Sequence, residues 1–301
     1  NYSRYSVTAM KKILITGASG FLGYHLLRVA SEKFEVYGIS NSKNIAVENA
    51  SIIKCDITNY IEIGNYFEDV EPDAVIHTAA VSDGNFCEQN KEFSYALNVE
   101  GTKNLAGICS DYNIPFVFTS TDLVFDGTKG MYKEDDEKNP VSVYGEQKAI
   151  AEEEVLRIYP MATVFRLPLM FGEPSASASN YLQKFISQIK NNEAVKLFYD
   201  EYRSICGAKS IAEGILKLFN EKGIIHLAGK EKLSRYEFGM KAAKLFQLNE
   251  ELLESCSRKD VKMAAPRPAD VSLDISKAVS LGFGPLSVDE ELNLIATGKY
   301  F

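Results

Sequence analysis

The stretch Lys12-Ile-Leu-Ile-Thr-Gly17-Ala-Ser-Gly20-Phe-Leu-Gly23 decides the fold. Its apolar first half predicts a strand, and its glycines predict a tight turn that leads into a helix. Gly17 permits the turn, Gly20 lets the backbone approach a pyrophosphate, and Gly23 allows the helix to pack closely on the strand. The free N–H groups at the start of such a helix attract an anion. We therefore predict a dinucleotide site here, although the GxxGxxG spacing differs from the GxGxxG fingerprint. The predicted contacts in this loop are Gly17, Ser19, Gly20, Phe21, Leu22 and Gly23.

Around this turn, short apolar segments alternate with longer amphipathic ones over the first 166 residues. Such alternation is typical of βαβ units, whose right-handed crossovers place helices on both faces of a parallel sheet. The predicted strands are 12–16, 35–39, 52–55, 74–78, 116–119 and 162–166, and the predicted helices are 23–32, 61–70, 93–112 and 143–157. We therefore expect an α/β protein with a Rossmann-type doubly wound parallel sheet.

The pattern changes after residue 166. A loop of small residues at 172–179 precedes predicted helices at 181–190, 211–220 and 235–246 and predicted strands at 195–198 and 224–228. We expect a cofactor-binding domain over residues 10–166 and a smaller C-terminal α/β substrate lobe over 167–301, with about 205–230 returning to the first domain. Residues 1–9 are polar and are expected to be a disordered or tag-like extension.

The composition argues against several classes of function. Hydrophobic residues make up 46% of the chain and charged residues 25%, which is typical of a globular protein. The net charge of −8 disfavours nucleic-acid and anionic-membrane partners. Five cysteines without a CxxC pair and three scattered histidines predict no metal site. No apolar segment approaches the roughly 18 residues that span a bilayer, so we expect a soluble, reduced, cytoplasmic protein.

The adenosine end of the dinucleotide is expected just after the second strand. A carboxylate there would select NAD(H) by binding the ribose 2′-hydroxyl, but none is present. Side chains able to donate to a 2′-phosphate stand there instead, so we predict NADP(H) in preference to NAD(H), held by Ser40, Asn41, Ser42 and Lys43. Asp56, followed by Ile57, is placed to accept a hydrogen bond from the adenine amino group. Alternatively, Asp56 caps the turn at Thr58.

Tyr144 and Lys148 stand four residues apart and therefore share one face of the predicted helix. A nearby ammonium favours phenolate over phenol, so we expect the pKa of Tyr144 to be lowered towards working pH. Such a tyrosine suits proton transfer at a carbonyl or alcohol. Thr121, at the end of the preceding strand, supplies a hydroxyl for the same substrate oxygen. An exposed helical pair with no chemical role is the alternative interpretation.

Five segments together resemble the extended short-chain dehydrogenase/reductase superfamily: the 17–23 loop, HTAA at 77–80, NVEGT at 98–102, STD at 120–122, and Tyr144 with Lys148. Within it, STDLVFDG at 120–127 and PRPADVSLD at 266–274 resemble the dTDP-4-dehydrorhamnose reductase (RmlD-like) family. The likeness extends over nearly the whole chain from Met10 and includes SRYEF at 234–238.

The resemblance implies an NADPH-dependent reductase of a nucleotide-linked 4-keto-6-deoxy sugar. Hydride would pass to the C4 ketone, with Tyr144 as proton donor, Thr121 orienting the substrate oxygen and Lys148 supporting Tyr144. Further cofactor contacts would come from Ala79, Ala80, Val81, Asn98, Thr119, Arg166 and Leu167. Substrate contacts would come from Ser82, Asp83, Thr121, Asp122, Arg203 and Arg267. The two arginines are expected to hold the substrate diphosphate, because guanidinium groups match phosphate oxygens; surface ion pairs are the alternative.

Some positions depart from the family pattern on the sugar side. Leu123 replaces the glutamate of the sugar-nucleotide dehydratases, which argues against elimination, and it also replaces the tyrosine usual in the rhamnose reductases. At the sixth strand, the family's Arg-Thr-Ser-Trp pattern is replaced by Arg166-Leu-Pro-Leu169, which lacks the aromatic residue. Two alternatives stay open: an NADP-binding regulatory subunit resembling the methionine adenosyltransferase β subunit, and a nucleotide-sugar epimerase. A homodimer is compatible with the resemblance.

Overall fold

The computed structural model describes residues 11–41, 45–175 and 177–301. Within these residues the chain forms a seven-stranded parallel sheet in the order β11-β6-β5-β4-β1-β2-β3. Its strands are β1 (Lys12–Thr16), β2 (Glu35–Ser40), β3 (Ala50–Lys54), β4 (Ala74–His77), β5 (Phe116–Thr121), β6 (Thr163–Leu167) and β11 (Gly223–His226). The strand order reverses at β1, which lies between β2 and β4. A doubly wound sheet binds its ligands beyond the carboxyl ends of the strands at this point.

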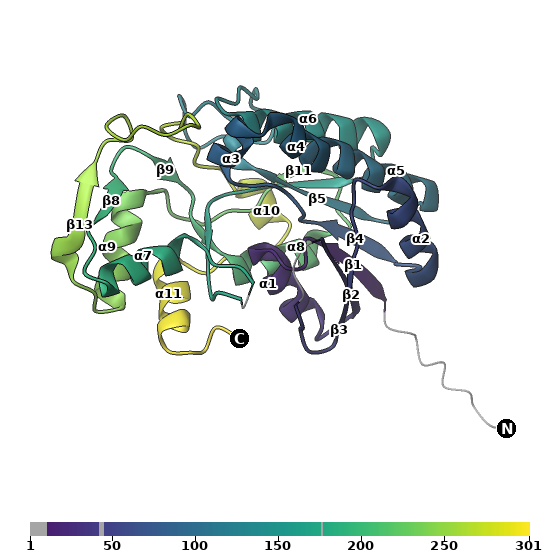
Figure 1. Ribbon diagram of the computed structural model, residues 1–301, viewed down its shortest axis with the longest axis horizontal. Coiled ribbons are helices and arrows are strands. Elements are labelled where there is room, and N and C mark those ends of the chain that lie inside the picture. The colour runs from purple at the N-terminus through teal and green to yellow at the C-terminus, as the bar shows by residue number, and fades with distance from the viewer. Residues whose placement is uncertain (1–10, 42–44, 176) are drawn as a thin grey trace.

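Helices cover both faces of the sheet, as Figure 1 shows. On one face, α1 (Phe21–Ala30) packs against α8 (Ala208–Leu218), and α10 (Ser276–Ser280) lies beside β11. The other face carries α2 (Tyr60–Val70), α5 (Thr102–Tyr112) and α6 (Val143–Ile158). Ile13 and Ile15 of β1 enter the core under α1, whereas Leu14 enters the core under α5. Burial on both faces explains why the strands are continuously apolar.

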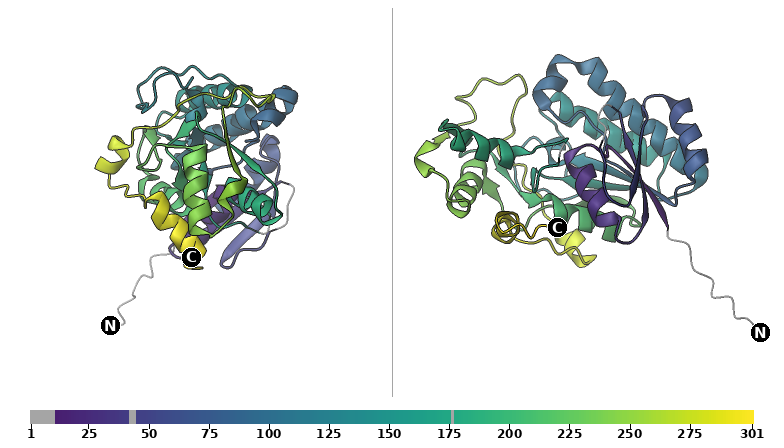
Figure 2. Two further views of the ribbon diagram at one scale, coloured as in Figure 1. Left: turned by 90° about the vertical axis from the view of Figure 1, so that its left-hand side faces the viewer. Right: turned by 60° about the horizontal axis from the view of Figure 1, so that its bottom comes forward.

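A smaller lobe with its own core follows β6 (Figure 2). Phe171, Phe185, Leu197, Phe238 and Leu292 are among its buried residues. Its helices are α7 (Tyr181–Lys190), α9 (Arg235–Leu245), η3 (Glu250–Leu252) and α11 (Val288–Ala296). Its strands are β7 (Met170–Phe171), β8 (Val195–Phe198), β9 (Tyr202–Arg203), β10 (Cys206–Gly207), β12 (Leu233–Ser234) and β13 (Leu253–Cys256). Between β10 and β12 the chain returns to the large sheet, where β11 pairs with β6 and α8 packs on α1.

One predicted helix, 93–112, is interrupted. The structure divides this region into α4 (Lys91–Tyr95), the π-helical turn η1 (Ala96–Gly101) and α5. The turn contains Asn98, whose side chain bonds the backbone of Val81, and Gly101, which lies against Ile57. Inserted π turns of this kind are frequent at functional sites. In the first half of the chain the structure also adds α3 (Gly84–Gln89) and η2 (Asp122–Val124), and several short elements of the second half were likewise not predicted.

Candidate active site

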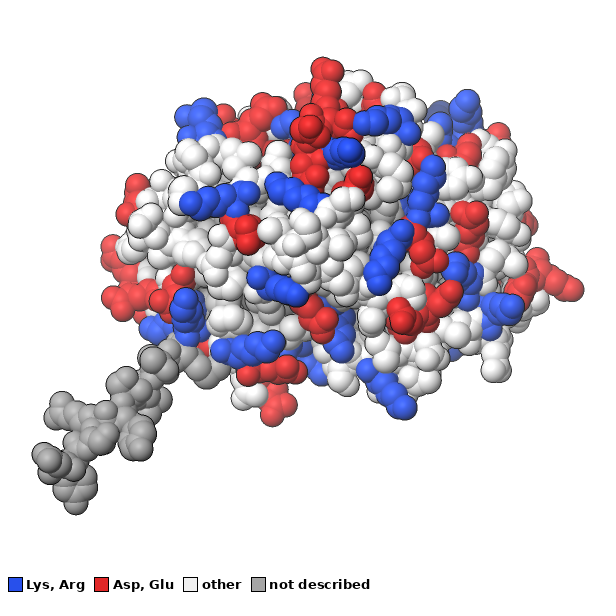
Figure 3. All heavy atoms as spheres, turned by 180° about the vertical axis from the view of Figure 1, so that it is seen from behind, with Lys and Arg blue, Asp and Glu red and all other residues white. Residues whose placement is uncertain are grey.

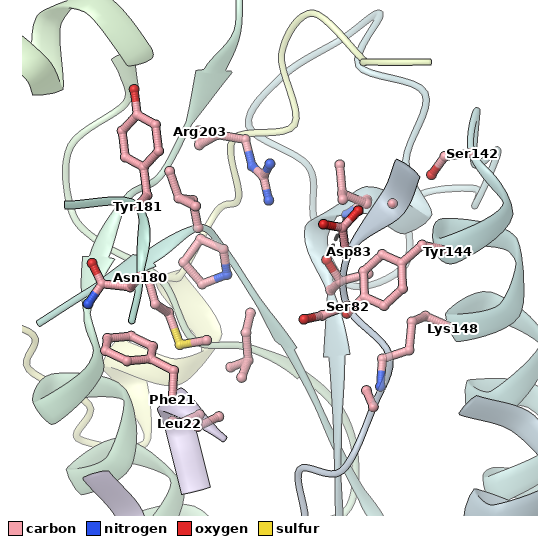
Figure 4. A pocket seen from close by; sticks show the side chains of 18 of the residues that line it. Phe21, Leu22, Ser82, Asp83, Ser142, Tyr144, Lys148, Asn180, Tyr181 and Arg203 are labelled. Atoms are coloured by element: carbon pink, nitrogen blue, oxygen red, sulfur yellow. Dashed lines mark hydrogen bonds between the residues drawn. The ribbon is translucent and has the colours of Figure 1, made fainter. Parts of the chain in front are cut away.

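A cleft of about 540 Å³ lies between the carboxyl edge of the sheet and the smaller lobe. In Figure 4, Tyr144 and Lys148 project into it from α6, opposite Phe21, Asn180 and Tyr181. Many of the predicted site residues line this cleft, namely Gly20, Phe21, Leu22, Gly23, Ala80, Ser82, Asp83, Thr119, Thr121, Tyr144, Lys148, Leu167, Arg203 and Arg267. The structure thus brings these predicted cofactor, catalytic and substrate residues to one site.

The glycine loop leaves the start of α1 open towards this cleft. Gly17 has a φ of +71°, and a Cβ there would lie 2.6 Å from the backbone N of Ala79. A Cβ on Gly23 would lie 2.1 Å from the Gly17 carbonyl oxygen, so α1 begins directly against the turn. The N-cap residue of α1 is Gly20, and no side chain caps the helix. This N-terminus, which no side chain caps, fits the pyrophosphate of a dinucleotide.

The smaller lobe contacts the glycine loop through the segment of small residues. The Ser177 hydroxyl donates a hydrogen bond to the Ser19 carbonyl oxygen at 2.8 Å. On the other side, the Ser40 hydroxyl donates to the Ser19 hydroxyl at 2.9 Å. Ser19 therefore lies between the end of β2 and the smaller lobe.

Of the predicted adenosine contacts, the described ones (Ser40, Asn41, Asp56 and Ile57) are not among the residues that line the cleft. Asn41 is exposed next to Ser40, and Ser42 and Lys43 lie outside the described residues. The Asp56 carboxylate accepts hydrogen bonds from the Thr58 N–H at 2.9 Å and from the Thr58 hydroxyl at 2.8 Å. The capping role that the sequence left open for Asp56 is therefore present. Ile57 is buried against Gly101.

Three elements position the predicted catalytic side chains. Thr121 ends β5, and its hydroxyl accepts a hydrogen bond from the Leu123 N–H at 3.2 Å. Tyr144 lies in the first turn of α6, which begins at the N-cap Ser142. A Cβ on Gly145 would lie 2.2 Å from the Leu123 carbonyl oxygen, so this glycine lets α6 approach Thr121 closely. Lys148 follows one turn later, with its Nζ 4.3 Å from the centroid of the Phe118 ring.

The pKa shift of Tyr144 differs from the prediction. Burial raises the pKa of Tyr144 above its ordinary value, and neighbouring Cys87 and Asp122 raise it further, while Arg203 and the Thr121 hydroxyl oppose them. Burial lowers the pKa of Lys148 to about 7, against the opposing effect of Glu152. The prediction of a lowered tyrosine pKa is therefore wrong for this structure. Both side chains are buried, and burial disfavours the charged form of each.

Asp122 and Arg203 bind each other rather than facing the cleft together. Asp122 is fully buried, and its two carboxylate oxygens accept bonds from Nε and Nη2 of Arg203. It also accepts a hydrogen bond from the Thr121 hydroxyl at 3.2 Å. Burial raises the pKa of Asp122, while Arg203 opposes this effect. Only Arg203 of this pair lines the cleft, so the structure places Asp122 beneath the surface of the cleft.

Arg166 does not line the cleft, although the resemblance implied that it contacts the cofactor. It is 1% exposed, and its Nε and Nη2 each donate to the Glu152 carboxylate at 2.9 Å. Glu152 also accepts a hydrogen bond from the Ser120 hydroxyl at 2.5 Å. Successive side chains of a β-strand point in opposite directions. Because Leu167 points into the cleft, its neighbour Arg166 points away from it.

The side chain of Asn98 holds the loop that follows β4 through hydrogen bonds. Asn98 accepts a hydrogen bond from the Val81 N–H at 2.8 Å and donates to the Val81 carbonyl oxygen at 3.1 Å. The same amide donates to Gln147 of α6 at 2.9 Å, which ties the loop to the helix of Tyr144. Ala79, Val81 and Asn98 therefore shape the cleft from behind, whereas Ala80, Ser82 and Asp83 line it.

Sequence reasoning missed several lining residues from the smaller lobe. Tyr181 and Lys184 of α7, Glu201 and Arg235 all reach the cleft. Arg235 was visible in the SRYEF segment, but its burial beside the distant Glu201 depends on tertiary structure. The described residues contain no cluster of three or more His, Cys, Asp or Glu side chains able to hold a metal ion. No helix in the described part of the chain is long and apolar enough to cross a membrane.

The sequence matches the model of a known protein family over almost its whole length. The family model described as "RmlD substrate binding domain" matches residues 10–296. The chain belongs to the RmlD family. The fold and the glycine loop described above agree with membership of this extended short-chain dehydrogenase/reductase group.

Relatives of this RmlD family member differ in role. A probable low-salt glycan biosynthesis reductase of Haloferax volcanii is 30% identical, over 92% of this chain and 95% of its own length. The methionine adenosyltransferase 2 subunit beta of Xenopus laevis is 28% identical, over 91% and 83% respectively.

Solved structures share the fold of this RmlD family member. A hypothetical dTDP-4-dehydrorhamnose reductase from Sulfolobus tokodaii is 33% identical, with a TM-score of 0.80 over 92% of this chain and 98% of that one. The dTDP-4-dehydrorhamnose reductase of Bacillus anthracis, solved in complex with NADP, has a TM-score of 0.85 over 96% and 99%. Its sequence is 23% identical to that of this chain, so the comparison shows a shared fold.

Proposed function

We propose that this protein is an NADPH-dependent reductase of a nucleotide-linked 4-keto-6-deoxy sugar, similar to the dTDP-4-dehydrorhamnose reductases. One observation supports the proposal most: Thr121, Tyr144 and Lys148 line the same cleft as the open N-terminus of α1. A proton donor and a dinucleotide-binding turn at one site are what carbonyl reduction requires. Two of the relatives named as reductases, from H. volcanii and S. tokodaii, support the same activity.

The cofactor proposed for the cleft is NADP(H) in preference to NAD(H). When bound, it supplies the hydride that reduces the ketone. The backbone of Gly20 to Gly23 would hold its pyrophosphate, and Ser40 and Asn41 would face its adenosine end. Asn98 would keep Val81 and Ala80 against its nicotinamide end, through the bonds to the Val81 backbone.

The chain's own residues would move one proton. Tyr144 stays a phenol throughout the neutral range because burial raises its pKa, so it is ready to protonate the substrate oxygen. The Thr121 hydroxyl, held by Asp122 and by the Leu123 N–H, would fix the position of that oxygen. Below its pKa of about 7, Lys148 carries a positive charge that favours loss of the proton from Tyr144.

The test is to follow NADPH oxidation with a panel of nucleotide-linked 4-keto-6-deoxy sugars that differ in base and in sugar stereochemistry. We expect at least one to be reduced, with NADPH preferred to NADH. If no member is reduced although NADPH binds, the reductase proposal is wrong.

A second candidate is a non-catalytic NADP-binding partner subunit. The observation in its favour is the X. laevis methionine adenosyltransferase subunit beta, whose 28% identity is close to the 30% of the H. volcanii reductase. Titration of the protein into a purified methionine adenosyltransferase catalytic subunit distinguishes the two. A stable complex together with no sugar reduction would favour the partner role, and sugar reduction without a complex would exclude it.

A further inference from the structure

The segment 261–268 forms a strap between the two lobes. It comes shortly after β13 of the smaller lobe, and its last four residues, Ala265 to Pro268, line the cleft. In Figure 1 the chain after β13 runs from the smaller lobe towards α3. There the Ala265 N–H donates a hydrogen bond to Oδ1 of Asn85 at 3.0 Å, although the two residues are 180 positions apart in the sequence. The strap therefore crosses the rim of the cleft and is held on the large lobe by α3.

The contact between the strap and α3 is small and close. A Cβ on Gly84, the first residue of α3, would lie 3.3 Å from the Ala265 Cβ, so the strap packs directly on this helix. Gly84 and Asn85 also line the cleft. The strap residues, all of them described, form neither helix nor strand, and Lys262 and Ala264 are exposed. Irregular segments with exposed backbone are those that open most readily.

A second residue of α3 holds the helix that carries Tyr144. The Glu88 carboxylate accepts a hydrogen bond from the Val143 N–H at 2.9 Å. Val143 is the first residue of α6 and directly precedes Tyr144. The N–H groups of a first helical turn have no acceptor within the helix, and a carboxylate beside them also complements the helix dipole. Glu88 therefore fixes the turn of α6 to which Tyr144 belongs.

We propose that α3 couples closure of the strap to the position of Tyr144, with Asn85 and Glu88 as positioning residues. The two side chains stand three residues apart on this short helix, so a shift of α3 moves both. When the strap leaves Asn85, the support that Glu88 gives to α6 loosens. Tyr144 is then aligned for proton transfer only while the cleft is closed to water. This inference rests on the proposed function for the reaction that Tyr144 serves.

The first test measures this coupling in the protein alone, by hydrogen exchange of the Val143 amide. Asn85→Ala removes the acceptor for the strap, whereas Asn85→Asp retains an acceptor oxygen. We expect Val143 to exchange several-fold faster than in the wild-type protein in Asn85→Ala, because its bond to Glu88 opens more often, and at nearly the wild-type rate in Asn85→Asp. Gln89→Ala, at the exposed end of the same helix, is the matched control. Unchanged exchange in Asn85→Ala would overturn the inference.

The second test measures kcat and KM for the keto sugar that the wild-type protein reduces fastest. Glu88→Leu removes the acceptor for the Val143 N–H, whereas Glu88→Gln retains one. We expect Glu88→Leu to lower kcat on the order of 10- to 100-fold, because a small misplacement of a reacting group is this costly. Glu88→Gln should keep most of the wild-type kcat. NADPH affinity should stay close to the wild-type value in both variants, because the glycine loop is unchanged.

The double variant distinguishes coupling from two independent effects. If α3 transmits the position of the strap, Asn85→Ala should lower kcat several-fold in the wild-type protein but cause no further loss in Glu88→Leu. Additive losses, or a loss in Glu88→Gln as large as that in Glu88→Leu, would overturn the inference. If the exchange of Val143 responds as expected but no keto sugar is reduced, the coupling stands and the reductase proposal alone is wrong.

Discussion

At the scale of single residues, the separation of residues in the sequence predicted which side chains lie together, but it did not predict their pKa shifts. Tyr144 and Lys148 share a helical face, as their separation of four residues required, and Thr121 ends the neighbouring strand. Their pKa shifts arise from burial by segments far away in the sequence, which spacing does not reveal. For the same reason the bond between Arg203 and Asp122, 81 residues apart, was not predicted.

The pKa of Lys148 leads to a prediction for the pH dependence of activity. The ammonium is present below about pH 7 and is lost as pH rises through that value. Tyr144 contributes no ionisation in this range because burial raises its pKa. We therefore expect kcat/KM for sugar reduction to fall above about pH 7, since kcat/KM reports the free protein. In Lys148→Arg, whose charge is permanent, this fall should disappear. A pH–rate profile with the same alkaline limb in both proteins would contradict the assignment.

At the scale of elements, the sequence predicted the alternation of strands and helices, and the structure adds how α6 is fixed. The continuous apolar strands and the amphipathic helices lie close to their predicted bounds, except for the helix predicted at 93–112, which η1 interrupts. The bonds of Glu152 to Ser120 of β5 and to Arg166 of β6 were not predictable, because they join three elements through buried polar side chains. These bonds set α6, and with it Tyr144 and Lys148, in register with Thr121.

We expect Glu152→Gln to destabilise the fold strongly. The substitution leaves Arg166 buried without its carboxylate, and breaking a buried pair costs about 3–5 kcal/mol. Glu154→Gln is the matched control on the same helix, because Glu154 pairs with the exposed Arg157 and should change stability little. The measurement is the free energy of unfolding in denaturant. Equal losses in the two variants would show that Glu152 does not hold α6 in place.

The glycine loop gives a second prediction at this scale. A Cβ at Gly23 would meet the Gly17 carbonyl oxygen, so we expect Gly23→Ala to displace α1, to cost about 1–3 kcal/mol and to abolish NADP⁺ binding. A Cβ at Gly107 of α5 would enter open space, so Gly107→Ala should be neutral or stabilising by up to about 1 kcal/mol. Calorimetric NADP⁺ titration of both variants measures the effect, and unchanged affinity in Gly23→Ala would refute this role of the loop.

At the scale of the whole molecule, charge is distributed unevenly. The chain carries a net charge of −8, and on the face shown in Figure 3 acidic and basic side chains lie interspersed. The charged residues that line the cleft are mostly basic, with Lys148, Lys184, Arg203, Arg235 and Arg267 against Asp83 and Glu201. Net charge could be read from the sequence, but this local excess could not, because it combines residues from both lobes.

We expect this local charge to make polyanion binding sensitive to salt. Raising the salt concentration from about 50 to about 500 mM should weaken dTDP and UDP binding several-fold, because screening shortens the reach of the cleft's field. Thymidine, which has no phosphate, serves as the control and should bind equally at both concentrations. Salt-independent diphosphate binding would mean that the basic lining does not contribute.

The most direct test of the account compares NADPH oxidation by the wild-type protein and Tyr144→Phe with the keto sugar that the wild-type protein reduces fastest. Phenylalanine removes the proton donor while it retains the ring. We expect Tyr144→Phe to lose about 10²- to 10⁴-fold in kcat and still to bind NADPH as tightly as wild type. A variant that retains most of the wild-type rate would contradict it.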